Sequence, residues 1–383
     1  MTMPDAPRPT AQAHVPFLDV GATYTELEDQ LTEAVQRVLR SGWYLLGTEL
    51  AAFEQEFAAY VGAPHAAGCG NGLDAIELIL RASGIGLGDE VIVPSNTYIA
   101  TWLAVSRVGA RLVPCEPDIR TFNIDPDRVE ELITDRTRAI LAVHLYGQPA
   151  DLQALAIIAK RHGLLLLEDA AQAHGASVSG TRIGAGQGVA WSFYPGKNLG
   201  AFGDAGAATM DDADADQRFR QLRNYGSSVK YYNEVIGSNS RLDEIQAAVL
   251  RVKLGRLDQW NERRLQTAAV YLEALSDVEG LTLPFVPQWA NPVWHLFVTR
   301  SPYRDSLATH LRSRGVDSIS HYPIPPHLQK AYAHLGIPKG AYPISERIHA
   351  EVLSLPIGPH LSEAETSQVI DAVKSFRPGK AAA

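Results

Sequence analysis

The sequence predicts an α/β protein with a large domain built on a mostly parallel sheet and a smaller α+β C-terminal domain. Short apolar runs alternate with segments of helical spacing, which is typical of parallel strands joined by right-handed crossovers. Four consecutive leucines at 164–167 are too few for a membrane span and indicate a strand buried on both faces. A chain of 383 residues also exceeds one ordinary core. We expect a disordered tail at 1–16, a large domain at 17–255 and a small domain at 256–383.

Composition narrows the class of protein. With 46% apolar and 20% charged residues, the chain has the make-up of an ordinary globular protein. Its formal net charge of -9 argues against nucleic acid as a partner, because phosphate backbones require a basic face. No apolar run approaches the roughly 20 residues of a spanning helix, and the first residues lack the apolar core of a signal peptide. Cys69 and Cys115 form neither a disulfide framework nor a zinc spacing, so we expect a cytoplasmic protein without membrane association.

Two amphipathic helices are expected first, at 24–39 and 48–60. The segment SGWYLLG separates them. Whether Trp43 and Tyr44 in this break are simple packing residues stays open.

The segment AAGCGNGLDAIELILRAS predicts a tight turn and a helix that begins near Gly72. The free amides at such a helix start bind anions, so this is a candidate phosphate site. Its glycines are spaced G-x-G-x-G, which differs from the dinucleotide fingerprint G-x-G-x-x-G.

Further strands and helices alternate up to the leucine run. A strand and a proline break in GDEVIVP precede a helix capped near 95–97. Strands at 111–115 and 139–143 then alternate with helices near 127–132 and 152–162. His144 follows one of these strands and has no companion at metal-ligand spacing, so we interpret it as a pocket-wall residue and expect no metal site.

A carboxylate and a lysine come to neighbouring strand ends in the next segment. Asp169 follows the leucine run, and ligands of open α/β sheets bind just outside the carboxyl ends of the strands. After a glycine-rich crossing, a strand at 189–193 leads to Lys197 in the turn Pro-Gly-Lys-Asn. This pair suits pyridoxal phosphate, which is anchored by a lysine Schiff base and needs an acid partner at its pyridine nitrogen. Gln172 could then meet the ring's phenolic oxygen and Ser192 the phosphate.

Each member of the pair has a plainer interpretation when taken alone. A carboxylate after an apolar strand is often a helix N-cap, and a lysine in a turn is usually solvated surface. The order and spacing of Asp169 and Lys197 favour the cofactor.

The rest of the chain predicts a charged helix that ends at Gly226 and a polar, aromatic loop at 227–240. One long helix at 242–275 then leads into the small domain. There we expect a strand at 294–300, a helix at 304–315 and an irregular loop at 317–329.

Several long runs resemble the DegT/DnrJ/EryC1 family of sugar-nucleotide aminotransferases, which have the aspartate aminotransferase fold (fold type I). These runs are EDAAQAHGA, SFYPGKNLGAFGDAGA, LRNYGS and GSNSRLDEIQAAVL, and the resemblance extends from PFLDV to LSLPIGPHL. It implies a pyridoxal phosphate enzyme in which the amides of Gly72 and Leu73 hold the phosphate. Tyr98 would stack on the ring, although a buried aromatic residue is more often part of a core.

The resemblance also implies a homodimer with shared active sites, because the position of Asn239 contacts the cofactor phosphate of the neighbouring subunit. The candidate substrate-binding residues on this basis are Tyr194, Lys230, Tyr231, His321, Tyr322 and His327. Lys230 and Tyr231 would approach the diphosphate of a sugar nucleotide, where local positive charge is needed in an acidic protein.

The activity that the resemblance implies is a ping-pong transamination. Lys197 moves the α-proton and Asp169 keeps the ring nitrogen protonated. Glutamate is the expected donor and a dTDP-linked 3-keto-6-deoxyhexose the expected acceptor, in amino-sugar biosynthesis for an antibiotic or a surface glycan. A 4-keto-sugar aminotransferase and a non-catalytic, cofactor-binding regulator are the alternatives. Related dehydratases carry histidine in place of the lysine, so Lys197 argues against that class.

Overall fold

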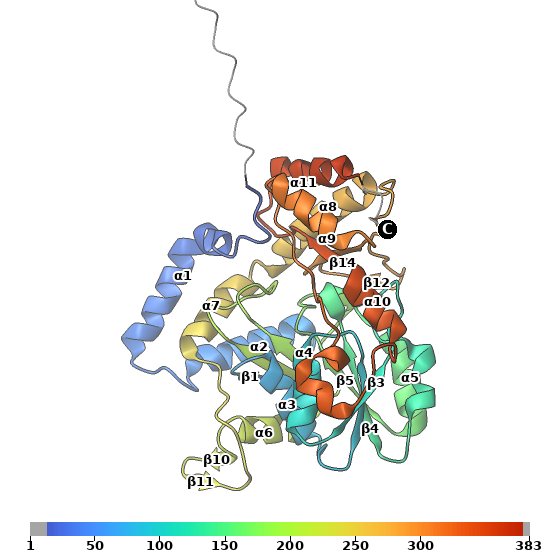
Figure 1. Cartoon of the computed structure of the whole chain (residues 1–383). Coiled ribbons are helices and arrows are strands. Elements are labelled where there is room, and N and C mark those ends of the chain that lie inside the picture. The colour runs from blue at the N-terminus through green and yellow to red at the C-terminus, as the bar shows by residue number, and fades with distance from the viewer. Residues whose placement is uncertain (1–13, 378–383) are drawn as a thin grey trace, which may run out of the picture.

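The computed structural model describes residues 14–377 and has a seven-stranded sheet at its centre (Figure 1). The strand order is β1 (His65–Cys69), β9 (Gly206–Met210), β8 (Val189–Ser192), β5 (Leu165–Asp169), β4 (Thr137–Val143), β2 (Glu90–Pro94) and β3 (Arg111–Cys115). The pairs from β8 to β3 are parallel, whereas β9 is antiparallel to both β8 and β1. The predicted mostly parallel α/β fold is confirmed.

Helices cover both faces of this sheet. The helices are α1 (Ala22–Ser41), α2 (Thr48–Val61), α3 (Gly72–Ala82), α4 (Ile99–Arg107), α5 (Leu152–His162), α6 (Ala213–Leu222), α7 (Glu244–Leu254), α8 (Leu257–Ala274), α9 (Arg304–Ser313), α10 (Pro343–Glu351) and α11 (Glu363–Ser375). The shorter strands are β6 (Ser177–Val178), β7 (Thr181–Arg182), β10 (Ser227–Val229), β11 (Tyr232–Asn233), β12 (Ala290–Asn291), β13 (Phe297–Arg300) and β14 (Val352–Leu355).

The central strands bury side chains on both sides because successive residues of a strand point to opposite faces. Val91 and Leu141 pack with α3 and α4 in one core, whereas Ile92 and Ile140 pack with α5 in another. The continuous apolar composition of these strands is therefore explained by burial on both faces. This arrangement leaves only the strand ends free to carry polar side chains.

A separate apolar core forms above the sheet, where β13 and β14 pair antiparallel under α8, α9 and α11 (Figure 1). Val15 belongs to this core and bridges Val316, although it precedes the large domain in sequence. The predicted tail boundary at residue 16 is therefore wrong. Residues 1–13 of the predicted tail lie outside the described residues.

The predicted long helix at 242–275 is two helices. α7 ends at Leu254, and Arg256 precedes α8 with a ψ of -8° and a φ of -112°, outside regular helix geometry. Gly255 lies between them, and glycine is about 1 kcal/mol less favourable than alanine inside a helix. Apolar periodicity continues through the break, so periodicity alone predicted one element.

Five smaller predictions also differ from the structure. The expected helix near 127–132 is two 3₁₀ turns, Pro126–Arg128 and Glu130–Leu132. The helix expected to be capped near 95–97 begins after Tyr98, which makes no side-chain cap. The charged helix ends at Leu222 and not at Gly226, and the predicted loop at 227–240 contains the β10–β11 hairpin. The strand predicted from residue 294 starts at Phe297.

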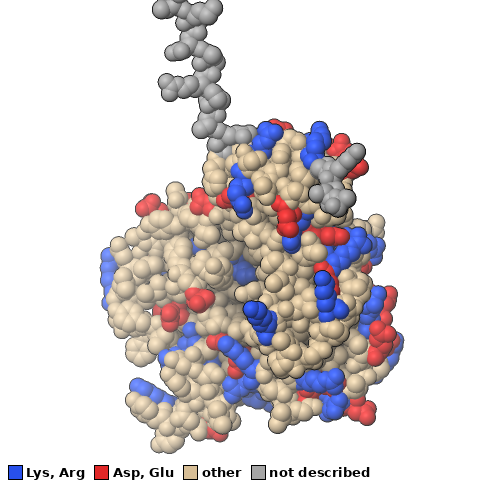
Figure 2. Space-filling view, viewed as in Figure 1, with Lys and Arg blue, Asp and Glu red and all other residues tan. Residues whose placement is uncertain are grey.

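No helix within residues 14–377 is long and apolar enough to cross a membrane. Acidic and basic side chains are interspersed over the face shown in Figure 2.

Candidate active site

Asp169 and Lys197 lie at the carboxyl-end edge of the central sheet. Asp169 is the last residue of β5 and is paired in register with Ala190 of β8. Lys197 lies in the turn that follows β8, where its backbone N–H donates to the carbonyl of Tyr194 at 2.8 Å. The charge of Lys197 acts on the pKa of Asp169, and the charge of Asp169 acts on that of Lys197. The structure thus brings the predicted pair together.

The Asp169 carboxylate is held by two hydrogen bonds and is only 6% exposed. The hydroxyl of Thr101 donates to Oδ2 at 2.8 Å, and the backbone N–H of Ala171 donates to Oδ1 at 3.1 Å. Burial raises the pKa of Asp169 above its usual value, and the two hydrogen bonds and the charge of Lys197 oppose this rise. The helix N-cap interpretation of Asp169 does not apply, because no helix follows it directly.

The Lys197 amine lies in surroundings that favour its neutral form. Burial lowers the pKa of Lys197 to about 8, and the nearby Asp169 charge opposes this shift. The interpretation of Lys197 as a fully solvated turn residue is therefore wrong, since the residue as a whole is only partly exposed. An amine that loses its proton near neutral pH can act as a nucleophile and as a base.

The turn that carries Lys197 is fixed from three sides. Asn198 donates its amide to Asn261 Oδ1 and to the carbonyl of Val293, both at 2.9 Å. The buried amine of Lys253 on α7 donates to the carbonyl of Gly200 at 2.7 Å. Helices α7 and α8 and the segment before β13 therefore position this turn.

Three histidines surround the lysine and stay neutral. The pKa of His174 is lowered to about 3 and that of His321 to about 4, by burial first and by the charge of Lys197 second. The same causes place the pKa of His295 well below its ordinary value. The site therefore gains no cation from these rings, and His295 Nδ1 lies 3.2 Å from Asn198 Oδ1.

The start of α3 forms a close-packed cradle beside β8. The side chain of Asn71 caps the helix by accepting from the backbone N–H of Asp74 at 2.8 Å. A Cβ added at Gly72 would lie 2.6 Å from the Cβ of Ser192, so the backbone approaches Ser192 as only glycine allows. Asp74 is turned aside and accepts from the hydroxyl of Ser240 at 2.7 Å. Free helix-start amides beside a serine fit a phosphate group.

Tyr98 and Tyr322 meet above Gln172. The ring of Tyr98 lies 4.9 Å from that of Tyr322, which comes from the C-terminal part of the chain. The side-chain amide of Gln172 donates to the Tyr322 hydroxyl at 3.1 Å and accepts from the backbone N–H of Tyr146 at 2.6 Å. The expected bond from Gln172 to a cofactor oxygen would therefore use its second amide hydrogen. Tyr98 is half exposed and does not belong to a core, which leaves its ring free to stack on a ligand.

The other predicted substrate-binding residues fall into two groups. Tyr194 is exposed beside Lys197, and His321 lies near that lysine with Nδ1 2.8 Å from Ser354 Oγ. His327 is not at the site, because its buried ring packs on Tyr342 and its Nε2 lies 3.0 Å from Glu346 Oε1. The structure therefore does not bring His327 to Lys197, and its role as a substrate contact stays a prediction.

The β10–β11 hairpin segment projects away from the rest of the chain (Figure 1). Tyr231 is 85% exposed, and the amine of Lys230 lies 5.0 Å from its ring centre. Asn239 is exposed, whereas the hydroxyl of the next residue, Ser240, accepts from the backbone N–H of Gly70 at 3.0 Å. The chain alone therefore does not bring Lys230 or Tyr231 to Lys197.

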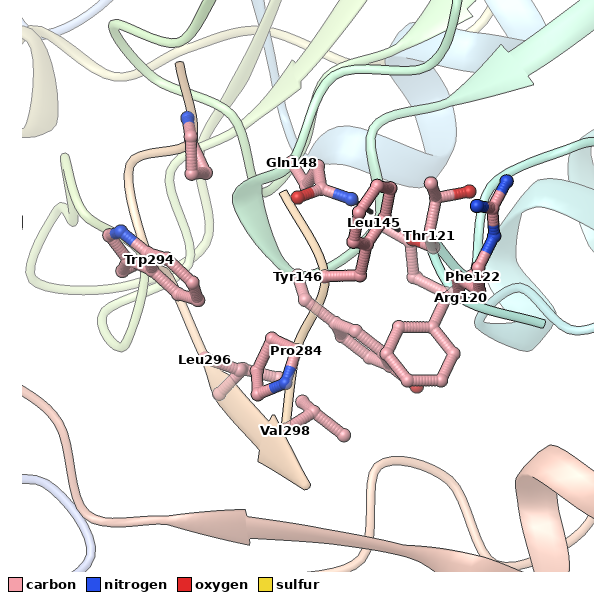
Figure 3. A pocket seen from close by; sticks show the side chains of 12 residues that line it. Arg120, Thr121, Phe122, Leu145, Tyr146, Gln148, Pro284, Trp294, Leu296 and Val298 are labelled. Atoms are coloured by element: carbon pink, nitrogen blue, oxygen red, sulfur yellow. Dashed lines mark hydrogen bonds between the residues drawn. The ribbon is translucent and has the colours of Figure 1, made fainter. Parts of the chain in front are cut away.

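A hollow beside the site is distinct from the Lys197 region (Figure 3). Its lining is mostly apolar and includes Phe122, Tyr146, Trp294 and Leu296. Arg120 stands over the ring of Phe285 at 4.9 Å at this hollow. The lining contains neither Asp169 nor Lys197, so this hollow is not the centre of the chemistry.

Sequence reasoning missed Thr101, His174 and His295 as site residues. Thr101 lies one helical turn after Tyr98, so the spacing of α4 places both toward the same side and gave a usable signal. His295 precedes β13 by two residues and reaches the site only through the fold. Within the described residues, no group of three or more His, Cys, Asp or Glu side chains is placed to hold a metal ion.

Comparison with known proteins identifies one family and several similar proteins. A model of the DegT/DnrJ/EryC1/StrS aminotransferase family matches residues 25–374. The chain is 58% identical over 362 residues to the erythromycin biosynthesis sensory transduction protein EryC1 of Saccharopolyspora erythraea, covering 94% of this chain and 99% of the relative. It is 56% identical over 363 residues to a dTDP-3-amino-3,4,6-trideoxy-alpha-D-glucose transaminase of Streptomyces venezuelae, covering 94% and 96%.

Solved structures are similar as well. The crystal structure of S. venezuelae DesV in complex with a ketimine intermediate has a TM-score of 0.94 at 56% identity and covers 94% of this chain and 98% of that one. A Bacillus subtilis structure, ntda with bound cofactor PMP, has a TM-score of 0.87 at 31% identity and covers 95% and 85%. These matches confirm the resemblance predicted from the sequence: the chain belongs to the DegT/DnrJ/EryC1/StrS aminotransferase family.

Proposed function

We propose that this protein is a pyridoxal phosphate-dependent aminotransferase that converts a dTDP-linked 3-keto-6-deoxyhexose to the 3-amino sugar, with glutamate as donor. The observation that carries the proposal is the pairing of Asp169 and Lys197 in one buried site at the sheet edge. A carboxylate and a lysine of low pKa are the two groups that this cofactor requires of its protein.

The residues present fit the cofactor at each of its ends. Lys197 would hold the aldehyde carbon, Asp169 the ring nitrogen, and the amides of Gly72 and Leu73 with Ser192 the phosphate. When bound, the cofactor supplies an electron sink for the carbanion formed at the donor's α-carbon.

Residues of the chain move the proton and hold the cofactor's partners in place. With a pKa of about 8, the Lys197 amine can take a proton from the donor and return it at a neighbouring carbon. Thr101 and the Ala171 amide hold the Asp169 carboxylate in one orientation. The three neighbouring histidines are neutral and add no positive charge near the amine. Their charge therefore does not weaken the amine as a base.

The names of the relatives support the choice of substrate. The S. venezuelae relative is a transaminase for a dTDP-3-amino-3,4,6-trideoxyhexose, and a relative from Aneurinibacillus thermoaerophilus, 51% identical, is one for a dTDP-3-amino-3,6-dideoxyhexose. Both of these products carry nitrogen at C3, which favours the 3-keto over the 4-keto substrate. A place in antibiotic or glycan amino-sugar biosynthesis and a cytoplasmic location stay predictions.

We also propose a homodimer with shared active sites. Trp43 and Tyr44 are 64% and 50% exposed, so their interpretation as internal packing residues is not supported. Ile236 in the segment after β11 is 89% exposed and lies in the same exposed, apolar and aromatic region of the sequence as Tyr231. Burial of such side chains against a second copy would bring the hairpin segment, and Asn239, to the partner's site.

One spectrum tests the proposal. The purified protein should show a near-visible absorption band that moves to shorter wavelength when glutamate is added, and a dTDP-linked 3-keto sugar should restore the band. A band that ignores glutamate would contradict the donor. A band that glutamate shifts but that only a 4-keto sugar restores would favour the alternative regiochemistry, and a shift that no keto sugar reverses would favour the non-catalytic regulator.

A further inference from the structure

A buried pair of side chains, His144 and Glu168, lies directly behind Asp169. His144 Nε2 is 2.9 Å from Glu168 Oε2, and both residues are buried. The backbone N–H of His144 also donates to the carbonyl of Asp169 at 3.0 Å. Glu168 and Asp169 are successive residues of β5, so their side chains point to opposite faces of the sheet. Glu168 therefore cannot touch a ligand bound to Asp169.

The hydrogen bonds of His144 define its tautomer. The backbone N–H of Ala150 donates to Nδ1 at 3.0 Å, so Nδ1 is an acceptor and carries no proton. Nε2 then carries the single ring proton and donates to Glu168. A neutral imidazole hydrogen-bonded to a carboxylate gives the pair one net negative charge.

No lysine or arginine within residues 14–377 lies within ion-pair distance of Glu168. Within residues 14–377, His144 is the only basic side chain within ion-pair distance of Glu168. Gly186 closes the other side, because a Cβ added there would lie 2.2 Å from Glu168 Oε1. The fold thus places an enclosed carboxylate one residue from Asp169.

We propose that His144 and Glu168 are positioning residues: their buried negative charge strengthens the hold of Asp169 on the proton of the bound cofactor's ring nitrogen. Loss of that proton would leave Asp169 and Glu168 both negative without a counter-charge, and the low-dielectric interior makes this unfavourable. The inference rests on the proposed cofactor.

The sign of the effect on Asp169 depends on the protonation state of His144. A charged imidazolium at His144 would lower the pKa of Asp169. A neutral ring does not cancel the negative charge of Glu168. The other groups that face Asp169 are the hydroxyls of Thr101 and Tyr322 and the amine of Lys197. None of these changes when Glu168 is replaced, so a variant at this position isolates the charge of the pair.

The test is Glu168→Gln in the holoenzyme, since the amide oxygen can still accept from His144 Nε2 while the charge is lost. We expect the midpoint of the pH titration of the lysine-linked cofactor band to fall by about 0.5–1 pH unit, the effect of one charge at an effective dielectric of about 20. The ¹⁵N shift of the ring nitrogen in ¹⁵N-labelled cofactor should move toward its unprotonated value. Both readouts are independent of turnover.

Glu168→Asp and Glu90→Gln are the controls. Glu168→Asp keeps the charge and should return the midpoint toward that of the wild type. Glu90 is a buried carboxylate at the opposite end of the sheet, the start of β2, and its replacement should leave the midpoint unchanged. Equal shifts for Glu168→Gln and Glu168→Asp would indicate a purely structural role and overturn the proposal.

A measurement on the wild type covers the case in which Glu168→Gln does not fold. The ring ¹⁵N shifts of His144 should report the neutral Nε2–H tautomer at neutral pH, and an imidazolium signal would overturn the proposal. A wild type without any cofactor band would contradict the proposed function itself. A normal wild-type band with an unchanged Glu168→Gln titration would refute only the inference about the pair.

Discussion

The hydroxyl of Thr101 donates a 2.8 Å hydrogen bond to Oδ2 of Asp169, and the two residues are 68 positions apart in the sequence. This bond joins the first turn of α4 to the end of β5. It fixes the orientation of the carboxylate that the proposed function assigns to the ring nitrogen.

Thr101→Val should therefore impair the enzyme without unfolding it, because valine has nearly the same shape and lacks the hydroxyl. A hydrogen bond to a charged group contributes about 1.5–3 kcal/mol, so we expect kcat to fall by roughly tenfold or more. Steady-state kinetics measure this loss, and Thr101→Ser should retain most of the rate. A fully active Thr101→Val would show that the bond does not orient Asp169.

Asp169→Asn should keep the fold and lose most of the activity. The neutral amide cannot balance a protonated ring nitrogen, whereas it can still accept from Thr101. Single-turnover measurements of the glutamate half-reaction should show a loss of at least about 100-fold, within the range of general electrostatic contributions. Unchanged rates would remove Asp169 from the proposed role.

Much of this site can be predicted from the sequence, because its main residues lie next to recognisable strands and helices. Asp169 is the last residue of β5 and Lys197 lies in the turn after β8, and parallel strands end at one edge, so their proximity is a consequence of topology. Gly72 was likewise visible as the start of a helix. His295 depends on how distant elements pack, which a single sequence does not encode in any local pattern.

The errors have a physical cause of the same kind. The periodicity of 242–275 is continuous because both α7 and α8 bury apolar residues, and only the conformation at Gly255 and Arg256 separates them. His327 was chosen for its chemistry, yet tertiary packing places its ring against Tyr342. Residue type predicts what a side chain can do, and burial decides whether it can do it.

Lys197→Ala should abolish both the lysine-linked absorption band and turnover, since alanine has no amine to bind the aldehyde or to move a proton. Lys197→Arg is the matched control, because it keeps a positive charge and should be equally inactive. Absorption spectra measure the loss of the band, and assays with glutamate measure the loss of turnover. Normal turnover by Lys197→Ala would refute the mechanism.

The low pKa of Lys197 predicts a pH-dependent stability of the protein without cofactor. Burial lowers this pKa from 10.5 to about 8, so the folded state binds the proton less tightly than the unfolded state. The resulting destabilisation is complete below pH 8 and disappears as the pH rises toward 10.5. Lys197→Met should therefore be more stable than the wild type at pH 7, and the gap should narrow at pH 9.5. Denaturant unfolding of both apoproteins measures it, and a gap that does not change with pH would contradict the burial of the amine.

Gly72→Ala should weaken cofactor retention, because the new Cβ would lie 2.6 Å from the Cβ of Ser192 and push the start of α3 from β8. Overpacking of this kind costs about 1–3 kcal/mol, so the cofactor dissociation constant should rise by roughly tenfold or more. Gly86→Ala is the control, since its nearest neighbour would be the carbonyl of Val108 at 3.6 Å. Equal cofactor affinities in both variants, measured by titration of the apoproteins, would argue against a phosphate cradle at Gly72.

Mixed dimers test whether the active site is shared. Asn239→Ala alone should weaken cofactor retention, and Lys197→Ala alone should be inactive. If Asn239 serves the partner's site, a heterodimer of the two variants contains one site with both native residues and one with neither. Random 1:1 reassembly makes about half of the dimers mixed, so activity at limiting cofactor should recover to roughly a quarter of wild type. If Asn239 serves its own site, every mixed dimer has one defect in each site, and reassembly should give no activity above that of the separate variants.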